Sequence, residues 1–293
     1  FLSQAIVSGA IGGLVDHPIS EVDCPQLVVQ DTQEALQKIA AKYRSNFSGT
    51  VIGVTGSCGK TSTKELLKVL LPKAYCTEGN LNNHLGVPLT LSKVSSLIHD
   101  IAVVEAGINQ INEMDRLATM INPDVCVISS IGYSHLEGLK NLETVAEEKI
   151  KLWLHSKDHC FGVFHEDLLQ FKCFATAVKQ RPHILIRNGN TADTLADENV
   201  VTFVISSETK KHGHLQKLII NRSGCPPLVL HPDSFSEGTI KNMVLAVVVA
   251  WKQGVSDEEI CERLPQYRPS GLRGSCLVRR GCSYTVDCYN ANP

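Results

Sequence analysis

The residues with the clearest chemical potential lie in the segment 51–63, which reads VIGVTGSCGKTST. An apolar, β-branched run ends at Thr55, a glycine-flanked loop follows, and Lys60 begins a helix-forming segment. A strand, a loop and a helix in this order direct backbone N–H groups and a helix N-terminus at one point, which suits a polyphosphate. The segment therefore predicts a nucleotide-binding loop rather than an ordinary turn before a helix.

The side chains of this loop have separate predicted roles. Lys60 supplies a point charge for the outer phosphates, and the Thr61 hydroxyl is placed to bind Mg²⁺. The spacing is shorter than in the general phosphate-loop pattern, because Val54 stands where that pattern has a glycine. The glycines let the backbone curl around an anion. We predict that the nucleotide is bound by Gly56, Ser57, Cys58, Gly59, Lys60, Thr61 and Ser62.

Two further side chains follow predicted strands. Glu105 ends the apolar run 101–104, and His135 comes after the run 125–131. The carboxyl ends of parallel strands meet at one edge of a sheet, where such proteins place their sites. We therefore predict that Glu105 lies near the metal and that His135 lies at the same edge. A solvent-facing glutamate and a structural histidine are the competing interpretations.

An asparagine-rich segment, 80–88, reads NLNNHLGVP. Asparagines are common in turns because the side chain hydrogen-bonds to nearby backbone. The same amides can also donate and accept hydrogen bonds at a bound substrate. The residue types alone do not decide between a turn and a substrate contact for Asn82 and Asn83.

Composition limits the class of protein. The chain has 293 residues, of which 43% are hydrophobic and 20% charged, and this is typical of a soluble globular protein. Its net charge of −2 and its aromatic content of 5% argue against nucleic acid and membrane surfaces as partners. The apolar runs at 1–15 and 243–251 are too short to span a bilayer, and we expect a helix followed by a short strand in the first.

The cysteines indicate a reducing compartment. There are eleven, an odd number, and they show no metal-binding spacing. Buried free thiols in the cytoplasm are the better interpretation than a disulfide framework. Cys58, beside Lys60 and a helix N-terminus, has the surroundings of a reactive thiol, although it could equally be only a small loop residue.

Hydrophobic patterning predicts an α/β fold. From Val51 onward, apolar strand-like runs alternate with helical patterns, which favours a mostly parallel sheet flanked by helices. Between 183 and 235 the pattern predicts a smaller, partly antiparallel sheet added to the first. A buried helix at 238–254 and another at 256–264 follow. The segment 265–274 is typical of a linker, and 276–293 of a further strand-rich piece.

Four motifs in a fixed order resemble the Mur ligases, the ATP-dependent peptide ligases of bacterial cell-wall synthesis. They are TGSCGKT at 55–61, EGNLNN at 78–83 with GVPLT at 86–90, EAGIN at 105–109 and HLEG at 135–138. The wording of the second and fourth motifs, together with DCYNANP at 287–293, is most similar to the member that adds D-alanyl-D-alanine. The resemblance covers nearly the whole chain.

The resemblance implies three parts and a truncation at both ends. Residues 1–48 would end a uridine-nucleotide substrate domain, 49–266 would form the central ATP-binding domain, and 267–293 would begin a C-terminal ligase domain. The implied enzyme is a cytoplasmic bacterial monomer. It would use ATP to join D-alanyl-D-alanine to UDP-N-acetylmuramoyl-tripeptide, forming ADP and an acyl-phosphate intermediate.

The resemblance also implies catalytic roles. Thr61 and Glu105 would hold one Mg²⁺, and His135 would help to hold a second. Lys149 matches the lysine that the family carbamylates with CO₂ to make a metal ligand. Asn290 matches a position near the adenine, and Arg273 is expected near the nucleotide.

The chain departs from the family pattern at two positions. Lys151 stands where the family usually has glutamate, which could alter carbamylation unless Glu147 or Glu148 compensates, and Cys288 replaces a common serine. Three competing functions stay open. A sister ligase, such as folylpolyglutamate synthase or the third-residue muramyl ligase, would use the same ATP site with another amine. A phosphate-loop switch or motor is the second, and a non-catalytic homologue is the third.

Overall fold

The computed structural model describes most of the chain. The described residues are 1–134, 136–189, 197–210, 213–232, 236–269, 271, 273–279 and 281–288. Two residues to which the sequence assigns a role, His135 and Asn290, lie outside this part of the chain.

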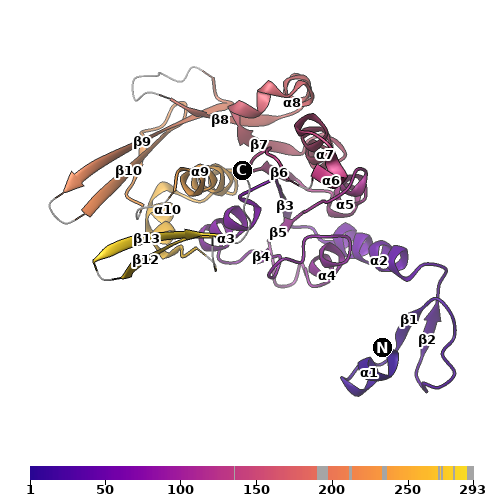
Figure 1. Cartoon of the computed structure of the whole chain (residues 1–293). Coiled ribbons are helices and arrows are strands. Elements are labelled where there is room, and N and C mark those ends of the chain that lie inside the picture. The colour runs from indigo at the N-terminus through magenta and orange to yellow at the C-terminus, as the bar shows by residue number, and fades with distance from the viewer. Residues whose placement is uncertain are drawn as a thin grey trace.

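A nine-stranded sheet forms the centre of the molecule (Figure 1). Its strand order is β11-β10-β9-β8-β7-β6-β3-β5-β4. The strands from β4 to β9 in this order pair in parallel, and β10 and β11 continue the sheet in antiparallel pairing. The bounds are β3 (Thr50–Thr55), β4 (Tyr75–Cys76), β5 (Ile101–Glu105), β6 (Val125–Ile128), β7 (Phe161–His165), β8 (His183–Asn188), β9 (Val200–Lys210), β10 (Gly213–Asn221) and β11 (Leu228–Leu230).

The predicted mostly parallel α/β sheet is confirmed, and so is antiparallel pairing between 183 and 235, but these strands extend the main sheet and do not form a second, smaller one. Strands β8 and β9 extend the main sheet in parallel, with Leu185 opposite Val200. In this sheet only β10 runs against the other strands, because β11 is antiparallel to β10 and returns to their direction, and both stay in the same sheet. The change of pattern in the sequence marks a change of strand direction within one sheet.

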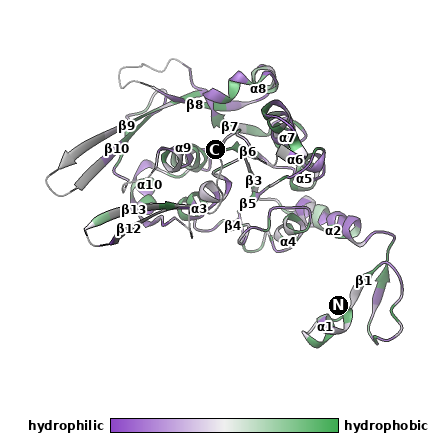
Figure 2. Cartoon of the chain, viewed as in Figure 1, coloured by the Kyte–Doolittle hydropathy of each residue, from purple (hydrophilic) through white to green (hydrophobic). Residues whose placement is uncertain are grey.

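Helices cover both faces of this sheet. They are α2 (Thr32–Asn46), α3 (Lys60–Leu70), α4 (Gly86–Ser92), α5 (Glu113–Ile121), α6 (Leu136–Leu139), α7 (Leu142–Leu154), α8 (Lys172–Ala177), α9 (Glu237–Lys252) and α10 (Asp257–Arg263), with short 3₁₀ helices at Glu166–Gln170 and Leu264–Gln266. Apolar colour is concentrated on the central strands and on α9 in Figure 2. Because side chains alternate along a strand, β3 contributes to a hydrophobic core on each face of the sheet. Val51 belongs to the core that also contains residues of α2, α4, α5, α7 and α8, and Ile52 belongs to the core that contains residues of α3, α9 and α10.

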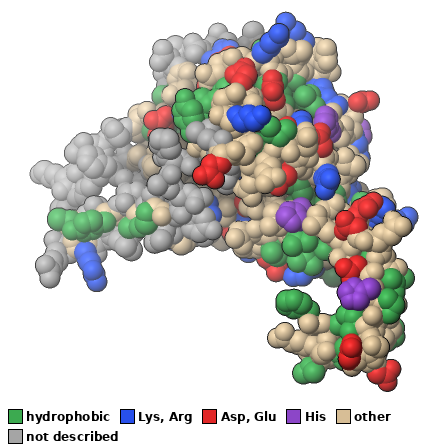
Figure 3. All heavy atoms as spheres, turned by 45° about the vertical axis from the view of Figure 1, so that its right-hand side comes forward, with side chains coloured by type: hydrophobic (Ala, Val, Ile, Leu, Met, Phe, Trp, Pro, Cys, Tyr) green, Lys and Arg blue, Asp and Glu red, His purple; other side chains and the backbone are tan. Residues whose placement is uncertain are grey.

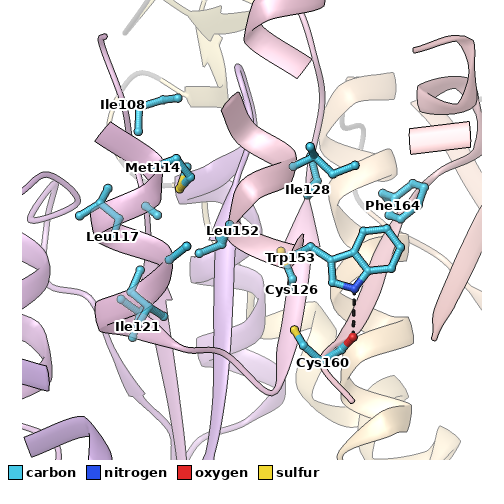
Figure 4. Close-up of a cluster of buried hydrophobic side chains, with 14 of the residues drawn as sticks. Ile108, Met114, Leu117, Ile121, Cys126, Ile128, Leu152, Trp153, Cys160 and Phe164 are labelled. Carbon is cyan, nitrogen blue, oxygen red and sulfur yellow. Dashed lines mark hydrogen bonds between the residues drawn. The ribbon is translucent and has the colours of Figure 1, made fainter. Parts of the chain in front are cut away.

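The core on the α7 side is organised around Trp153 (Figure 4). This indole is fully buried, and its N–H donates to the carbonyl oxygen of Cys160 at 3.0 Å. Its ring meets Phe164 with a centroid separation of 5.5 Å. A buried tryptophan therefore fills the space between α7 and β7 with its polar atom satisfied, which is the usual requirement for burying this residue.

Helix starts follow from capping side chains. The Asp31 carboxylate accepts from the backbone N–H groups of Gln33 and Glu34, so Asp31 caps α2. Ser256 and Glu259 form a capping box at the start of α10. These local signals explain why the helical boundaries are close to those predicted from the sequence.

Two small pieces lie at the ends of the described chain. The first contains α1 (Leu2–Val7) and the parallel pair β1 (Gly13–Val15) and β2 (Gln26–Val28), and it projects from the main body in Figure 1. The second is the antiparallel pair β12 (Arg273–Arg279) and β13 (Cys282–Asp287). Helix α2 packs against α4 and α5. The expected helix and short strand at 1–15 are confirmed, whereas the three-part domain division stays a prediction.

Charges of both signs are mixed on the surface (Figure 3), and most of the cysteines whose side chains are described are not buried. Figure 3 shows acidic and basic side chains interspersed on one face. No disulfide joins the cysteines of the described part, as predicted, but only Cys126 and Cys160 among them are buried, so the expectation of generally buried thiols is wrong. Within the described residues, no helix combines the length and the apolar character needed to cross a membrane.

Candidate nucleotide site

The loop between β3 and α3 requires its two glycines. Gly56 has φ of +148° and Gly59 has φ of +85°, a backbone region that residues with a side chain rarely adopt. A Cβ at Gly56 would lie 2.1 Å from Ser129 Oγ, and one at Gly59 would lie 2.4 Å from Asn242 Oδ1. The loop is therefore tightly enclosed by the segment after β6 and by α9.

Residues 129–134, directly after β6, hold this loop in place. The Ser57 N–H donates to the Ser130 carbonyl oxygen at 2.8 Å, and the Cys58 N–H donates to Ser130 Oγ at 3.0 Å. The Ser57 hydroxyl also accepts from the Gly132 N–H at 2.9 Å. Ser129 and Ser130 both donate to the Cys58 carbonyl oxygen. The loop is thus shaped by contacts more than 70 residues away in sequence.

Lys60 folds back over the loop at the first turn of α3. Its ammonium donates to the carbonyl oxygens of Gly56 at 2.8 Å and Ser57 at 3.3 Å. Burial lowers the pKa of Lys60, Glu105 opposes that shift, and Arg273 adds to it. The positive charge of Arg273 therefore acts on Lys60, while the expected role of Arg273 near the nucleotide stays a prediction.

Glu105, at the end of β5, is the centre of the site. Its side chain is only 1% exposed, and its Oε1 accepts from Asn82 Nδ2 at 2.8 Å and from Thr61 Oγ1 at 3.2 Å. Its Oε2 has no hydrogen-bond donor within the described chain. A buried carboxylate oxygen without a donor is costly unless a ligand completes it.

This pair of groups fits a divalent cation. The Thr61 hydroxyl and the Glu105 carboxylate are adjacent hard oxygen donors, and Glu105 Oε2 is the orphaned atom that a cation would satisfy. Three or more His, Cys, Asp or Glu side chains do not gather anywhere in the described residues to form a denser metal cluster. His135, the expected additional ligand, lies outside those residues.

Lys64 is a buried cation that the sequence reasoning missed. It is 1% exposed, and its ammonium donates to the carbonyl oxygens of Thr77 at 2.9 Å and Gly79 at 3.0 Å. It also lies 3.1 Å from Glu65 Oε1 and 3.8 Å from Glu105 Oε2. The available signal was its position four residues after Lys60, which places both on one helix face.

The two candidate asparagines have different surroundings. Asn82 reaches the site directly, since its amide donates to Glu105. Asn83 instead accepts from the backbone N–H groups of Leu85 and Gly86 at 3.1 and 2.8 Å, where α4 begins. The Asn82 side-chain amide is thus bonded to the Glu105 carboxylate, whereas Asn83 Oδ1 accepts hydrogen bonds within a turn.

Lys149 lies on α7 with its side chain 1% exposed. Burial, followed by the positive charge of Lys60, lowers its pKa well below the usual value. Lys149 is therefore electrostatically coupled to the nucleotide loop and is predisposed to the neutral amine form.

Lys151 points away from this lysine. Its ammonium lies 2.7 Å from Asp115 Oδ2 and 2.7 Å from Glu148 Oε1. Glu148 in turn accepts from the Asn112 N–H at 2.9 Å. The substitution of lysine for the usual glutamate at 151 is compensated by two carboxylates on α5 and α7.

The structure thus brings together most of the residues that the sequence selected. Residues 56–62, Asn82 and Glu105 form one contact network, and Lys149 and Arg273 are coupled to it through Lys60. The roles assigned to these residues, and to His135 and Asn290, stay predictions. Besides Lys64, sequence reasoning missed Ser129, Ser130 and Asn242, which contact the loop only through the fold.

Fold and site together define a phosphate-loop α/β protein, with its loop at the carboxyl edge of a parallel sheet. The sequence pattern of the Mur ligase middle domain matches residues 54–250, which is more than half of the chain. The chain therefore belongs to the Mur ligase family.

Individual relatives agree with this assignment. The chain is 30% identical over 303 residues to the UDP-N-acetylmuramoyl-tripeptide–D-alanyl-D-alanine ligase of Bacillus subtilis, covering 100% of this chain and 62% of that protein. It is 27% identical over 307 residues to the ligase of the same name from Treponema pallidum, with the same coverage. A crystal structure of MurF from Acinetobacter baumannii superposes with a TM-score of 0.81 and 26% identity, covering 99% of this chain and 62% of the other. The chain thus spans less than two thirds of the length of these relatives.

Proposed function

We propose that this chain forms the nucleotide-binding part of an ATP-dependent amide ligase of peptidoglycan precursor synthesis. The reaction would join D-alanyl-D-alanine to UDP-N-acetylmuramoyl-tripeptide and release ADP and phosphate. The observation that carries the proposal is the buried Glu105 carboxylate, bonded to Thr61 beside the phosphate loop with one oxygen available. The names of the relatives similar over the whole chain support the choice of substrates.

The metal-side residues would prepare ATP for transfer. Thr61 and Glu105 would hold one Mg²⁺, and His135 and Lys149 would take part in holding a second. When bound, these ions neutralise phosphate charge and orient the transferring group. Lys60 would leave the carbonyl oxygens of its own loop and pair with the outer phosphates, while the N–H groups of the loop fix their position.

The proposed chemistry needs no nucleophile from the protein. The terminal carboxylate of the tripeptide attacks the γ-phosphorus of ATP, and the bond to the β-phosphate oxygen breaks to give an acyl phosphate and ADP. The amine of D-alanyl-D-alanine then attacks the acyl carbon, and inorganic phosphate leaves as the amide forms. Positioning and charge stabilisation by the site would supply most of the rate enhancement.

Lys149 would act after carbamylation. Its neutral amine would attack CO₂, forming an N–C bond and releasing one proton, which converts a potential cation into an anionic metal ligand. Complete burial and a lowered pKa support this role, because only the neutral amine reacts. A carbamate resonance in ¹³C NMR after equilibration with ¹³C-bicarbonate is expected in the native protein and absent in Lys149→Arg. A native spectrum without that resonance would contradict the proposal.

The remaining proposals concern the substrate contacts, the oligomeric state, the cellular location and the domain organisation. Asn82 and Asn83 would lie near the tripeptide, and Arg273 and Asn290 near the nucleotide. We expect the protein to act as a monomer in the bacterial cytoplasm, without nucleic acid or membrane partners. The three-part organisation at 1–48, 49–266 and 267–293 would place the reaction between the domains.

Phosphate release by the protein in its full natural length tests the whole proposal. It is measured with ATP and Mg²⁺, with and without each of the two substrates, and the product is identified by mass spectrometry. Release that requires both substrates and yields the pentapeptide is the expected result. Release without them would favour a switch or motor, and failure with this amine but success with another would identify a sister ligase.

A further inference from the structure

Lys64 is unusual among lysines because its side chain is buried and its ammonium hydrogen-bonds to protein carbonyl oxygens. It is almost completely buried on the same face of α3 as Lys60, yet its ammonium turns toward the segment 77–79 rather than toward the loop. A buried lysine requires compensation by charge and by hydrogen bonds to its ammonium. Here the partners of Lys64 include Glu105 and Thr77, the residue whose hydroxyl accepts from the Glu105 N–H.

The contacts of Lys64 and Glu105 converge on Thr77. Lys64 donates to the Thr77 carbonyl oxygen at 2.9 Å, and the Glu105 N–H donates to the Thr77 hydroxyl at 3.0 Å. Thr77 itself extends the edge of the sheet, since its N–H donates to the Val103 carbonyl oxygen at 2.9 Å. One residue therefore connects the buried lysine to the backbone that carries the carboxylate.

The hydrogen bonds of the Lys64 ammonium go to groups other than Glu105. It donates to the two carbonyl oxygens, and it forms an ion pair with Glu65 Oε1 at 3.1 Å. Glu105 Oε2, at 3.8 Å, therefore receives attraction from the positive charge without a hydrogen bond. Lys64 can balance the charge of the buried carboxylate and still leave its outer oxygen available to a ligand.

The same contacts anchor the asparagine segment. Residues 77–79 immediately precede Asn80, and Asn82 is the residue that donates to Glu105 Oε1. Pinning the two carbonyl oxygens at 77 and 79 fixes the start of this segment relative to α3. Loss of the lysine would leave the buried Thr77 carbonyl oxygen without this donor and would release the Gly79 carbonyl oxygen to solvent, which favours movement of the segment.

We propose that Lys64 is a positioning residue, which holds the Glu105 carboxylate and the Asn82 segment in the arrangement that binds Mg²⁺–ATP. The inference rests on the proposed nucleotide function and adds to it a residue that does not touch the nucleotide. It makes two separable claims. Lys64 fixes the conformation of residues 77–83, and that fixed conformation strengthens binding of ATP with Mg²⁺ more than binding of ATP alone.

The test uses Lys64→Met, which keeps the length of the side chain without its charge or donors. Lys68→Met is the matched control, because Lys68 is exposed one turn later on α3. In the full natural-length protein, hydrogen–deuterium exchange at residues 77–83 is measured without ligand. Calorimetry then gives the affinity for ATP with Mg²⁺ and for ATP in EDTA.

We expect Lys64→Met to accelerate exchange at 77–83 and to weaken Mg²⁺–ATP binding by about tenfold or more, since hydrogen bonds to a charged group are lost. Binding of ATP in EDTA should change much less, and Lys68→Met should match the native protein in every measurement. Unchanged exchange together with unchanged Mg²⁺–ATP affinity would overturn the proposal. Tighter Mg²⁺–ATP binding would also overturn it, because Lys64 would then act only by repelling the cation.

A second variant covers the case in which Lys64→Met does not fold. Lys64→Gln removes the charge but keeps an amide group that can donate to one of the two carbonyl oxygens at 77 and 79. A smaller loss of Mg²⁺ selectivity in the same direction is expected, and its absence would contradict the proposal. If the native protein itself does not bind ATP, the proposed function fails, whereas the exchange measurement still tests whether Lys64 fixes residues 77–83.

Discussion

Two ionic clusters lie at opposite ends of the same parallel strands. At the carboxyl end, Glu105 accepts from Thr61 and Asn82 but keeps Oε2 without a donor. At the amino end, both oxygens of Asp124 are satisfied: Oδ2 accepts from Arg44 and from the Val51 N–H, and Oδ1 accepts from Lys157.

The difference separates a functional cluster from a structural one. Arg44 completes the amino-end cluster by donating also to the carbonyl oxygens of Phe47, Ile121 and Asn122, which fastens α2 to the end of α5. A complete network of this kind stabilises the native state, and removing one partner leaves a buried charge uncompensated. An incomplete network keeps an atom for a ligand at some expense of stability.

The largest expected effect comes from removing the charge at the carboxyl end. Glu105→Gln should lower ligase turnover on the order of 10²–10³-fold, as expected for a group that stabilises developing charge in the transition state. The free energy of unfolding should change little, because glutamine keeps an acceptor for Thr61 and Asn82 and removes the buried oxygen that lacks a donor, while Lys64 keeps its ion pair with Glu65. Phosphate release and urea unfolding of the same preparation check both parts. A loss of turnover that is fully explained by a loss of folded protein would show that Glu105, like Asp124, has a structural role.

The matched amide substitution at the amino end should do the opposite. Asp124→Asn is expected to lower the free energy of unfolding by about 3 kcal/mol, because Arg44 and Lys157 lose their counter-charge. Turnover of the folded fraction should be retained, since this carboxylate lies at the other end of the strands. Urea denaturation with activity normalised to folded protein gives the answer. A full loss of turnover with native stability would contradict the structural assignment.

The same carboxylate predicts a pH dependence of stability. Burial alone would raise the pKa of Asp124, but the hydrogen bonds from Lys157 and the Val51 N–H and the charge of Arg44 lower it below the ordinary value of 3.8. The unfolded state then binds the proton more tightly, so the contribution is complete above pH about 4 and is lost as the pH falls through the folded-state pKa. Urea midpoints of the native protein and Asp124→Asn should converge in acid, and a constant difference would refute this.

The smallest effect is expected at the departure from the family pattern. Lys151→Met should lower the free energy of unfolding by about 1 kcal/mol or less, because its pairs with Asp115 and Glu148 are partly exposed. Turnover and the carbamate resonance of Lys149 should be unchanged, since the Lys151 ammonium points away from that residue. A strong effect on either readout would show that position 151 acts on the site.

Sequence reasoning recovered the elements that depend on local signals. The apolar run before Thr55, the glycines of the loop and the cap at Asp31 each express a local backbone requirement, so β3, α2 and α3 were predictable. Glu105 was predictable for a related reason: it ends an apolar strand.

The remainder depends on contacts between distant residues. Ser130 and Asn242 contact the phosphate loop only because β6 and α9 lie beside β3 and α3, and nothing in their own sequence neighbourhoods indicates this. Lys64 has the pattern of a solvated helix lysine, and only the position of Thr77 makes it a buried one. The pairing of β8 with β9 likewise follows from the direction of the chain through space rather than from β-branched composition.

The serine contacts around the phosphate loop also have a kinetic consequence. Because the Ser57 and Cys58 N–H groups donate to Ser130, the protein's own contacts hold the loop in its curled shape. The entropy of ordering it is lost during folding rather than during binding. ATP should therefore associate at a rate set by encounter and by displacement of the Lys60 ammonium from the loop carbonyl oxygens, with no slow phase for loop ordering.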